Sequence, residues 1–476
     1  RDAIAARSSV ADADRALIAL EVAAVLGTSP EPDAWLAVCE ARGGWASEEV
    51  FRLPEARGLI RWRTGRFEFA HPLLRESLER RAREAGRLIG HHAAVAQLLE
   101  ETGGDARRVA THWLAAGRTE RALAPLIGSV ERLIDRSELL GAHDALDRYE
   151  AALDALGAAA DDGRRLPMLI GRAEAFAQAA YLDRAEAAID AAAAIARTAV
   201  ERASVAQLRG VVWSRRGATA LSVEAFEHAI ALLDGGHLAQ RVALRAMYGI
   251  AEARKLTGDF AGAEDSYREV LAGTSPDERM HAMALVGLSD AASRRGRPEE
   301  ALLYGQEALR RLEQKGYWHA VAVTQNSLGD LERRRGHLHE AEAYYRESLE
   351  IMLVVGSADA AIVRMNLALL ALARDDFEGA DATLVVARTG LEGRDRDLYV
   401  RICDVLRLPP AIVRRDRAAA DEIVRVARVL CGTVADPDVG AVLARAAALA
   451  AAAEWADLSD VLSALASSQD PGSTRA

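Results

Sequence analysis

Apolar residues recur along most of the chain at intervals of three and four residues, the spacing that places them on one face of an α-helix. These stretches come in pairs, and a glycine often separates the two members of a pair. Gly217, Gly258, Gly296 and Gly336 follow one another after 41, 38 and 40 residues by subtraction, and Asp375 continues the series 39 residues later. Such regular spacing predicts a repeated helical hairpin.

Three further positions of the repeat carry short side chains, and Gly117 extends the series of anchors toward the amino terminus. Helices approach each other closely only where side chains are short, so these positions predict contacts between the two helices of a hairpin. Larger residues such as Phe226, Tyr267 and Tyr345 are expected to fill the space between repeats. The short residues are Ala110, Gly210, Ala251, Ser289, Gly329 and Ala368 seven positions before the anchors; Ala122, Ser222, Ala263, Ala301, Ala341 and Ala380 five after; and Ser129, Ala229, Val270, Ala308, Ser348 and Ala387 twelve after.

Each anchor is expected to end the first helix of its hairpin, because a left-handed residue there caps the exposed carbonyls. Weaker hairpins are predicted at residues 128–157, 165–197, 397–430 and 438–467, with Pro409 and Pro410 interrupting the third of them. We therefore expect about ten hairpins in all.

The first 82 residues do not follow the repeat. Helical patterns there are followed by two short apolar runs, LIRW and FEFA, around a turn that contains Gly65. A helix is expected to restart directly afterwards, since Pro72 suits a first helical turn. Helices followed by a β-hairpin predict a small winged-helix-like module. Its first three helices are predicted at residues 11–26, 33–41 and 47–56.

The segment NSLGDLERRRGHLHEAEAYYRESLE, residues 326–350, resembles the tetratricopeptide repeat (TPR). The repeat spacing exceeds the usual length of about 34 residues, and Gln325 stands where the family has an early aromatic residue. The resemblance implies an all-α, right-handed TPR-like α-solenoid behind the amino-terminal module. The family's Leu-Gly, Gly, Ala and aromatic positions are matched by Leu328, Gly329, Gly336, Ala341 and Tyr345.

The strings FEFAHPLLRESLERRA, GHHAAVAQLLEE and VATHWLAAGRTERAL resemble the winged helix and first repeats of bacterial STAND signal-transduction ATPases, including maltose-regulator-like and Ser/Thr-kinase-associated members. In that family a nucleotide-binding domain lies upstream, the winged helix can contact nucleotide, and the repeat arm senses an inducer or partner. The resemblance implies that this chain is the sensor part and that an upstream domain binds ATP or ADP. It also implies nucleotide sensing by His71; ordinary hydrogen bonding between strand and helix is the alternative.

Four parts are expected: a winged-helix-like module (1–82), connecting helices with the first TPR-like hairpins (83–157), a TPR-like superhelix (158–467) and a disordered tail (468–476). Because the chain begins at Arg1, without a methionine, we expect it to be a fragment of a longer protein.

The composition of the chain limits which classes of partner are expected. The chain has 71 acidic residues against 60 lysines and arginines, a net charge of -11, which argues against a direct nucleic-acid partner. No stretch predicts a membrane helix or a signal segment. Cys39, Cys403 and Cys431 lack CxxC spacing, so neither a disulfide framework nor a zinc site is expected, and a cytoplasmic setting is favoured.

No motif for catalysis stands out. A phosphate-binding loop requires Gly-Lys-Ser/Thr, and neither Lys255 nor Lys315 lies in one. Kinase motifs and a GxSxG elbow are also missing. We expect no enzymatic activity in this chain, and any ATPase or kinase activity would lie outside it.

Two groups of histidines are candidates for metal ligands. Adjacent His91 and His92 point about 100° apart on a helix and are not expected to converge with distant His112. His337 and His339 lie with Glu340 at one polar turn. We expect a metal at neither place.

The first helices of successive hairpins are expected to line a groove that binds a protein or peptide. The alternative for each residue of this predicted groove is a solvated helix face. Functionally, the leading interpretation is the sensor and interaction arm of a signal-transduction regulator; a stand-alone TPR scaffold or the regulatory part of a transcription factor are alternatives. Self-association into a homo-oligomer is a further candidate. The predicted groove residues are Tyr248, Glu252, Lys255, Asp290, Asn326, Asp330 and Arg333.

Overall fold

The computed structural model describes residues 10–44, 55–63, 66–275, 278–392, 396–432 and 436–469, with the side chains of residues 10–13 and 62–67 excepted. The described chain is almost entirely helical. It divides into two compact units, one of Arg1–Arg132 and Leu140–Met168 and the other of Leu133–Leu139 and Leu169–Ala476.

The first unit begins with the module that precedes the repeats. An antiparallel hairpin, β1 (Ile60–Arg63) with β2 (Arg66–Phe69), pairs Ile60 with Phe69, as the two apolar runs predicted. The predicted helix at residues 47–56 falls largely outside the described residues, and so does Gly65. The helices of this unit are α2 (Val10–Leu26), α3 (Pro32–Ala41), α5 (Pro72–Glu84), α6 (Leu88–Glu101), α7 (Ala106–Ala115), most of α8 (Thr119–Asp135), α9 (Leu139–Ala155) and the 3-10 turn η1 (Gly163–Arg165).

A buried ionic contact joins α2 to α6. Glu21 is fully buried, and Arg87 donates two hydrogen bonds to its carboxylate at 2.6 and 2.8 Å, while His91 Nε2 lies 3.2 Å away. Burial raises the pKa of Glu21, but the hydrogen bonds from Arg87 and His91 outweigh this and hold it below its ordinary value. Removing one partner would leave a charge uncompensated in the core. This contact therefore fixes the module on the helix that opens the hairpin array.

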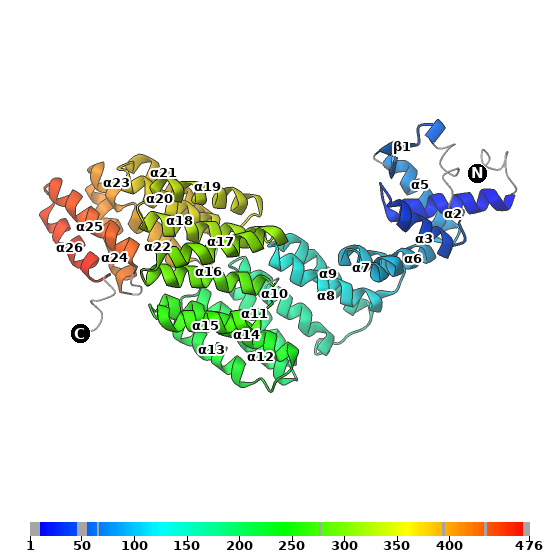
Figure 1. Ribbon diagram of the computed structural model, residues 1–476, viewed down its shortest axis with the longest axis horizontal. Coiled ribbons are helices and arrows are strands. Elements are labelled where there is room, and N and C mark those ends of the chain that lie inside the picture. Colours follow the sequence, from blue (N-terminus) through cyan, green and yellow to red (C-terminus); the bar gives the residue numbers. More distant parts are fainter. Residues whose placement is uncertain are drawn as a thin grey trace. The chain divides into compact units, whose positions relative to one another are not determined.

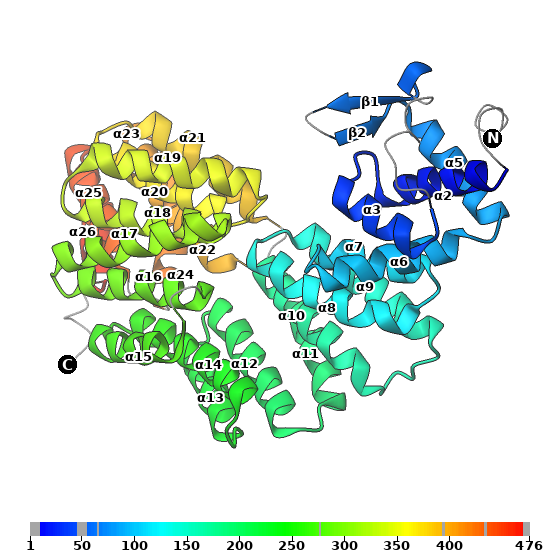
Figure 2. The same cartoon turned by 45° about the vertical axis from the view of Figure 1, so that its right-hand side comes forward.

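The second unit is a stack of antiparallel helix pairs, which Figures 1 and 2 show from α12 with α13 to α25 with α26. Its helices are α10 (Leu166–Gln178), whose first turn belongs to the first unit, α11 (Leu182–Ile195), α12 (Ala199–Arg215), α13 (Thr219–Ala231), α14 (His237–Leu256), α15 (Phe260–Gly273), α16 (Arg279–Arg294), α17 (Pro298–Lys315), α18 (Trp318–Arg334), α19 (Leu338–Val354), α20 (Ala360–Ala373), α21 (Phe377–Leu391), α22 (Asp397–Leu406), α23 (Leu408–Val413), α24 (Arg417–Cys431), α25 (Pro437–Ala452) and α26 (Ala456–Ser467).

All the short residues of the three repeat positions are buried, as the sequence predicted. Their small size admits large neighbours: a Cβ added at Gly329 would lie 2.6 Å from the ring of Tyr345. Three of the four serines at these positions make hydrogen bonds between helices, and Ser129 donates to a carbonyl of its own helix, so their burial leaves no hydroxyl unpaired. Ser222 Oγ donates to the carbonyl of Gly210 at 2.9 Å, and Ser348 Oγ donates to that of Ala322 at 2.7 Å.

The anchor residues have the left-handed conformation expected of helix ends. Gly217, Gly258, Gly296 and Gly336 have φ of 78°, 80°, 74° and 84°. Asp375, with φ 62°, adopts the same conformation without being a glycine, which short polar residues tolerate best.

The irregular hairpins differ in detail from the sequence prediction. α8 begins at Thr119, nine positions before the predicted start at residue 128, because Pro125 is accommodated inside it. The region 397–430 contains three helices, since Pro409 and Pro410 occupy the first turn of the short helix α23, where their missing N–H groups are least costly.

Replacing Gly329 with alanine should test the packing of the repeat. The added methyl group meets the buried ring of Tyr345, so we expect a loss of about 1–3 kcal/mol of stability. Gly390 is the matched control: it lies in helix α21, is exposed, and its added Cβ would meet only Ala361 at 3.9 Å. Gly390→Ala should raise stability by ~0.5–1 kcal/mol. Thermal and urea unfolding followed by circular dichroism measure both; equal effects would contradict the packing.

Candidate functional site

A cavity of about 640 Å³ opens in the second unit and is called the inner cavity below. The first helices of the hairpins, α12, α14, α18, α20 and α22, provide most of its wall. Its lining combines apolar and charged side chains, as ligand sites usually do. The lining residues are Ser214, Arg215, Arg216, Gly217, Glu252, Leu256, Val323, Asn326, Met352, Asp359, Ile362, Val363, Arg396, Asp397, Leu398 and Tyr399.

Two of the predicted groove residues line this cavity. Glu252 and Asn326 belong to its wall, and the side-chain oxygen of Asn326 accepts a hydrogen bond of 2.9 Å from Asn366. The other five predicted residues are not among its lining residues.

Those five form, with Glu252 and several neighbours, a continuous set of contacts along α14, α16 and α18. Lys255 Nζ lies 3.0 Å from Glu252 and 3.4 Å from Asp290, and Arg334 continues the series from Asp290 at 3.7 Å to Asp330 at 3.9 Å. Burial lowers the pKa of Lys255, but the charges of Glu252 and Asp290 outweigh this and raise it above its ordinary value. Lys255 therefore stays charged and joins neighbouring repeats.

The hydroxyl groups of Tyr267 and Tyr345 bind the two carboxylates at the ends of this series of contacts. Tyr267 donates a hydrogen bond to Glu252, and Tyr248 packs against the Tyr267 ring at 5.7 Å between centroids. Tyr345 donates to Asp330 at 2.6 Å. Arg333 completes the set.

Arg333 lies 3.5 Å from Asp330 and donates a hydrogen bond of 2.8 Å to Asp438 on α25. The structure thus brings the predicted residues together, but chiefly in contacts with one another and with neighbouring side chains.

A second charged group stands on the wall of the inner cavity. Asp359 accepts a hydrogen bond of 2.8 Å from Arg396 and lies 3.2 Å from His319 Nε2. Burial raises the pKa of Asp359, but the His319 hydrogen bond and the Arg396 charge outweigh it and hold the pKa well below its ordinary value. Tyr399 lies beneath the Arg396 guanidinium, with 5.5 Å between guanidinium carbon and ring centroid.

Arg215, on α12, lines the same cavity. The pKa of Arg215 lies below its ordinary value, chiefly because surrounding protein atoms remove water from the guanidinium. The negative charge of Asp359 raises this pKa, and the positive charge of Arg396 lowers it further. Its side chain is nevertheless exposed, as a residue on the wall of a concavity would be.

Sequence reasoning missed this group. The repeat places Ser214, a lining residue of the cavity, in the same column as Lys255 and Arg333, three positions before the anchor, but Arg215 falls outside that column. Arg396 and Tyr399 lie on α22, outside the regular repeats, and no column pointed to them.

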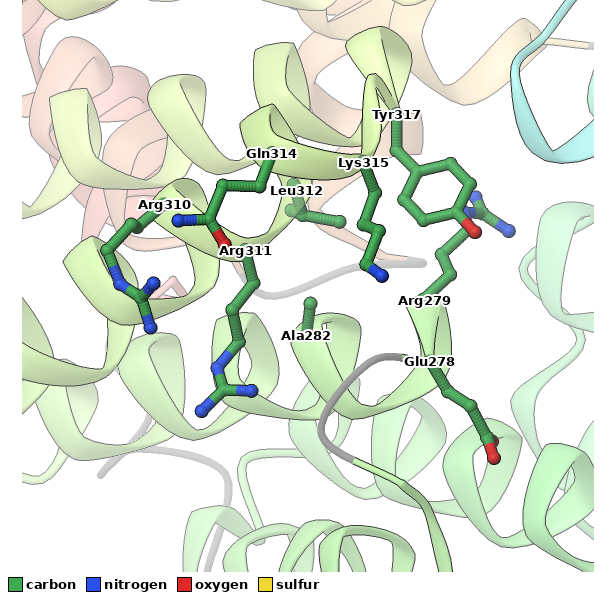
Figure 3. Close-up of a pocket in the computed structure, with 9 residues that line it drawn as sticks. All are labelled: Glu278, Arg279, Ala282, Arg310, Arg311, Leu312, Gln314, Lys315 and Tyr317. Carbon is green, nitrogen blue, oxygen red and sulfur yellow. The ribbon is translucent and has the colours of Figure 1, made fainter.

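A smaller cavity of about 140 Å³ lies between α16, α17 and the start of α18 (Figure 3). Four basic residues line it, and Figure 3 shows Lys315 between Arg279 and Arg311. Glu307 pairs with both Arg310, at 2.8 Å, and Arg311, at 2.6 Å. Part of the positive charge is therefore balanced within α17.

His71 lies in the first unit, just after β2, where the sequence placed it. It is the N-cap residue of α5, and its exposed side chain makes no capping hydrogen bond.

The expectation that His92 and His112 stay apart was wrong. Their Nδ1 atoms lie 2.9 Å apart, because α6 and α7 pack together and bring the two rings to 5.1 Å between centroids, tilted by 37°. His91 points elsewhere, to Glu21. Burial, with the neighbouring positive charges, lowers the pKa of both His92 and His112 to about 4. Within the described ranges, no three or more His, Cys, Asp or Glu side chains are grouped to hold a metal ion.

The three cysteines are free thiols, and burial raises the pKa of Cys39 and of Cys403 to about 12. Among the helices that the structure describes, none combines the length and apolar character needed to cross a bilayer.

Comparison with known proteins agrees with the repeat architecture. The family model described as Tetratricopeptide repeat matches residues 321–353. No curated protein matches the chain. The chain thus contains a tetratricopeptide repeat in the hairpin α18–α19.

Solved structures share the fold at low sequence identity. A Rap protein complexed with Competence and Sporulation Factor is 14% identical, with a TM-score of 0.55, and the match covers 74% of this chain and 99% of that one. NprR in complex with its cognate peptide NprX is 12% identical, with a TM-score of 0.50, over 72% of this chain and 97% of that one.

A Signal Transduction ATPase with Numerous Domains (STAND) protein with a tetratricopeptide repeat sensor, from Pyrococcus horikoshii, is also similar. It is 12% identical, with a TM-score of 0.50, and the match covers 94% of this chain and 65% of that one. These likenesses establish the fold as an all-α, TPR-like solenoid, as the sequence predicted.

The contact of His92 with His112 predicts a pH dependence of stability. In the folded chain these imidazoles bind protons near pH 4, whereas unperturbed ones bind them near 6.5. The unfolded state therefore takes up more protons as the pH falls, so the stabilisation is complete above about pH 6.5 and is lost toward pH 4. Urea unfolding of the His92→Gln, His112→Gln double variant should show a flatter dependence than wild type across this window. A His237→Gln control, at an exposed histidine, should keep the wild-type slope.

Proposed function

We propose that this chain is the sensor and interaction arm of a signal-transduction regulator, and that its inner cavity binds a segment of a protein or peptide. Binding is then passed to an ATPase or kinase domain outside the chain. The observation that carries this proposal is the inner cavity itself, because its charged and amide groups stand among apolar side chains.

The lining suits an extended peptide. Leu256, Val323 and Ile362 offer apolar contacts, and Asn326 offers an amide of the kind that hydrogen-bonds a peptide backbone. Micromolar affinity corresponds to about -8 kcal/mol, which a few such anchors can provide. Among the proteins of similar fold, NprR was solved with a peptide, which supports the same class of ligand here.

The upstream link rests on the amino-terminal module. Its helices and hairpin are consistent with a winged helix, and the STAND protein of similar fold joins an ATPase to a tetratricopeptide sensor. A stand-alone scaffold would need no such module, so the module favours the regulator. The chain itself we propose to be non-enzymatic.

A blocking substitution in the inner cavity should abolish peptide capture. We would select ligands for the 476-residue chain from a displayed library of random heptapeptides and measure their affinities by fluorescence anisotropy. Ile362→Arg places a charge on the apolar wall and should weaken binding at least about tenfold. Val354→Arg is the matched control, because Val354 is 88% exposed and is not a lining residue of the cavity. Peptides that bind both variants like wild type would reject the cavity as the site.

Substitution of His71 tests the link to nucleotide. In the full-length protein, His71→Ala should weaken nucleotide affinity or speed nucleotide exchange, because the exposed imidazole would no longer reach the phosphates. The measurement is mant-nucleotide binding and release, with His237→Ala as the control at another exposed histidine. Unchanged affinity and exchange would exclude His71 as the sensor and leave peptide binding unaffected.

A further inference from the structure

We propose that the inner cavity selects an uncharged peptide segment and seats its apolar side chains against Leu256, Val323 and Ile362. This inference rests on the proposed peptide-binding function and specifies the chemistry of the segment that is bound. It follows from the balance of charge on the cavity wall and from the exposure of the aliphatic side chains there.

The charged side chains that line the inner cavity are equally divided between the two signs. Three arginines are matched by three carboxylates, so the lining residues carry no net formal charge. A ligand with an excess of either sign therefore gains no net attraction from this wall, and it loses hydration on entering the concavity. The six residues are Arg215, Arg216, Arg396, Glu252, Asp359 and Asp397.

Four of these charges are already bound to partners in the protein. Arg396 donates a hydrogen bond of 2.8 Å to Asp359, and Glu252 lies 3.0 Å from Lys255 Nζ. Arg216 pairs with two carboxylates of α11 at 2.5 and 2.7 Å. A ligand charge that displaced one of these partners would leave another charged group uncompensated, which is costly. These contacts therefore do not favour a charged ligand.

The two remaining charges, those of Arg215 and Asp397, have opposite signs. Both side chains are exposed to water. An ion pair between exposed groups contributes little, because each group gives up hydration and the attraction is screened. Contacts with Arg215 or Asp397 therefore add little to the affinity of a charged ligand.

The aliphatic part of the wall, in contrast, is incompletely covered by protein. Leu256 is 64% exposed, and Val323 and Ile362 are half-buried beside the same space. Val323 packs against the apolar cluster that contains Met352 and Val363, two buried residues that also line the cavity. An apolar ligand would remove this surface from water, and that gain requires no charged partner.

The dimensions of the cavity suit a segment of several residues. Its volume of about 640 Å³ lies within the range of pockets that enclose whole small ligands. Leu256, Val323 and Ile362 come from α14, α18 and α20, so a ligand that contacts all three spans three hairpins. The part of a bound peptide inside the cavity is therefore uncharged, and its charged residues lie outside.

The first experiment measures the contribution of Leu256. The heptapeptides selected on the 476-residue chain are titrated against wild type, Leu256→Ala and the matched control Leu303→Ala. Leu303 is also a helical leucine, is 68% exposed and is not a lining residue of the cavity. Leu256→Ala should weaken binding about tenfold, as expected for loss of an apolar anchor, and Leu303→Ala should bind like wild type. Both free variants should keep the wild-type urea midpoint, because neither side chain is buried.

The second experiment tests the charge of the ligand. Each apolar residue of the peptides is changed singly to Asn and to Asp. At seated positions Asn should weaken binding about tenfold, and Asp should weaken it at least about tenfold further. The parent affinity should change less than about twofold between about 0.05 and 0.5 M NaCl, since salt screens charge. Arg215→Gln and Asp397→Asn should each bind the parent within about twofold of wild type.

Three outcomes separate this inference from the proposed function. Selected peptides that share a charged residue, bind more weakly at high salt and lose about tenfold or more with Arg215→Gln or Asp397→Asn would overturn the inference while peptide binding stands. An unchanged affinity of Leu256→Ala would also overturn it. Peptides insensitive to Ile362→Arg would instead reject the cavity, and the inference with it.

Discussion

The close approach of the two helices in each hairpin is the constraint on which the second unit depends. It is possible only because short residues occupy the same three positions of each repeat, and every one of them is buried. The contact at Gly329 leaves room for Tyr345, whose hydroxyl then reaches Asp330 on the neighbouring helix. The same short residue thus allows both the packing of the Tyr345 ring and the hydrogen bond of its hydroxyl group. Because each hairpin is stabilised largely by its neighbours, the faces of the first helices are held in a fixed order along the stack.

That order explains why charged residues on separate repeats meet. Lys255, Asp290 and Arg334 come from three successive first helices and form one series of ion pairs. Side chains in this series are engaged with one another, so they position the wall of the solenoid. The wall of the inner cavity draws on more distant parts of the chain, because Arg215 on α12 lines it together with Asp359 and Tyr399, 144 and 184 positions later by subtraction. The series of ion pairs thus joins α14 and α18, which also provide part of this wall.

Features that depend on the regular spacing of residues within a hairpin could be predicted from the sequence. The repeat anchors, the buried columns and the β-hairpin followed from spacing alone, because each depends on residues within one or two hairpins. Contacts between distant repeats did not follow. His92 and His112 meet because α6 packs against α7, and Arg215 and Asp359 line one cavity although 144 residues separate them. Neither juxtaposition is encoded in a short window of sequence. The prolines at 409 and 410 were visible, but the extra helix α23 that they begin was not.

The central claim is that the wall built by the first helices is the binding surface. Hydrogen exchange of the 476-residue chain, with and without the tightest selected heptapeptide, measures this most directly, since ligand contact slows the opening of the helices it touches. The account predicts slower amide exchange in α12, α18, α20 and α22, with α13, α21 and α24 little changed. Protection confined to those second helices, or to the amino-terminal module, would contradict it.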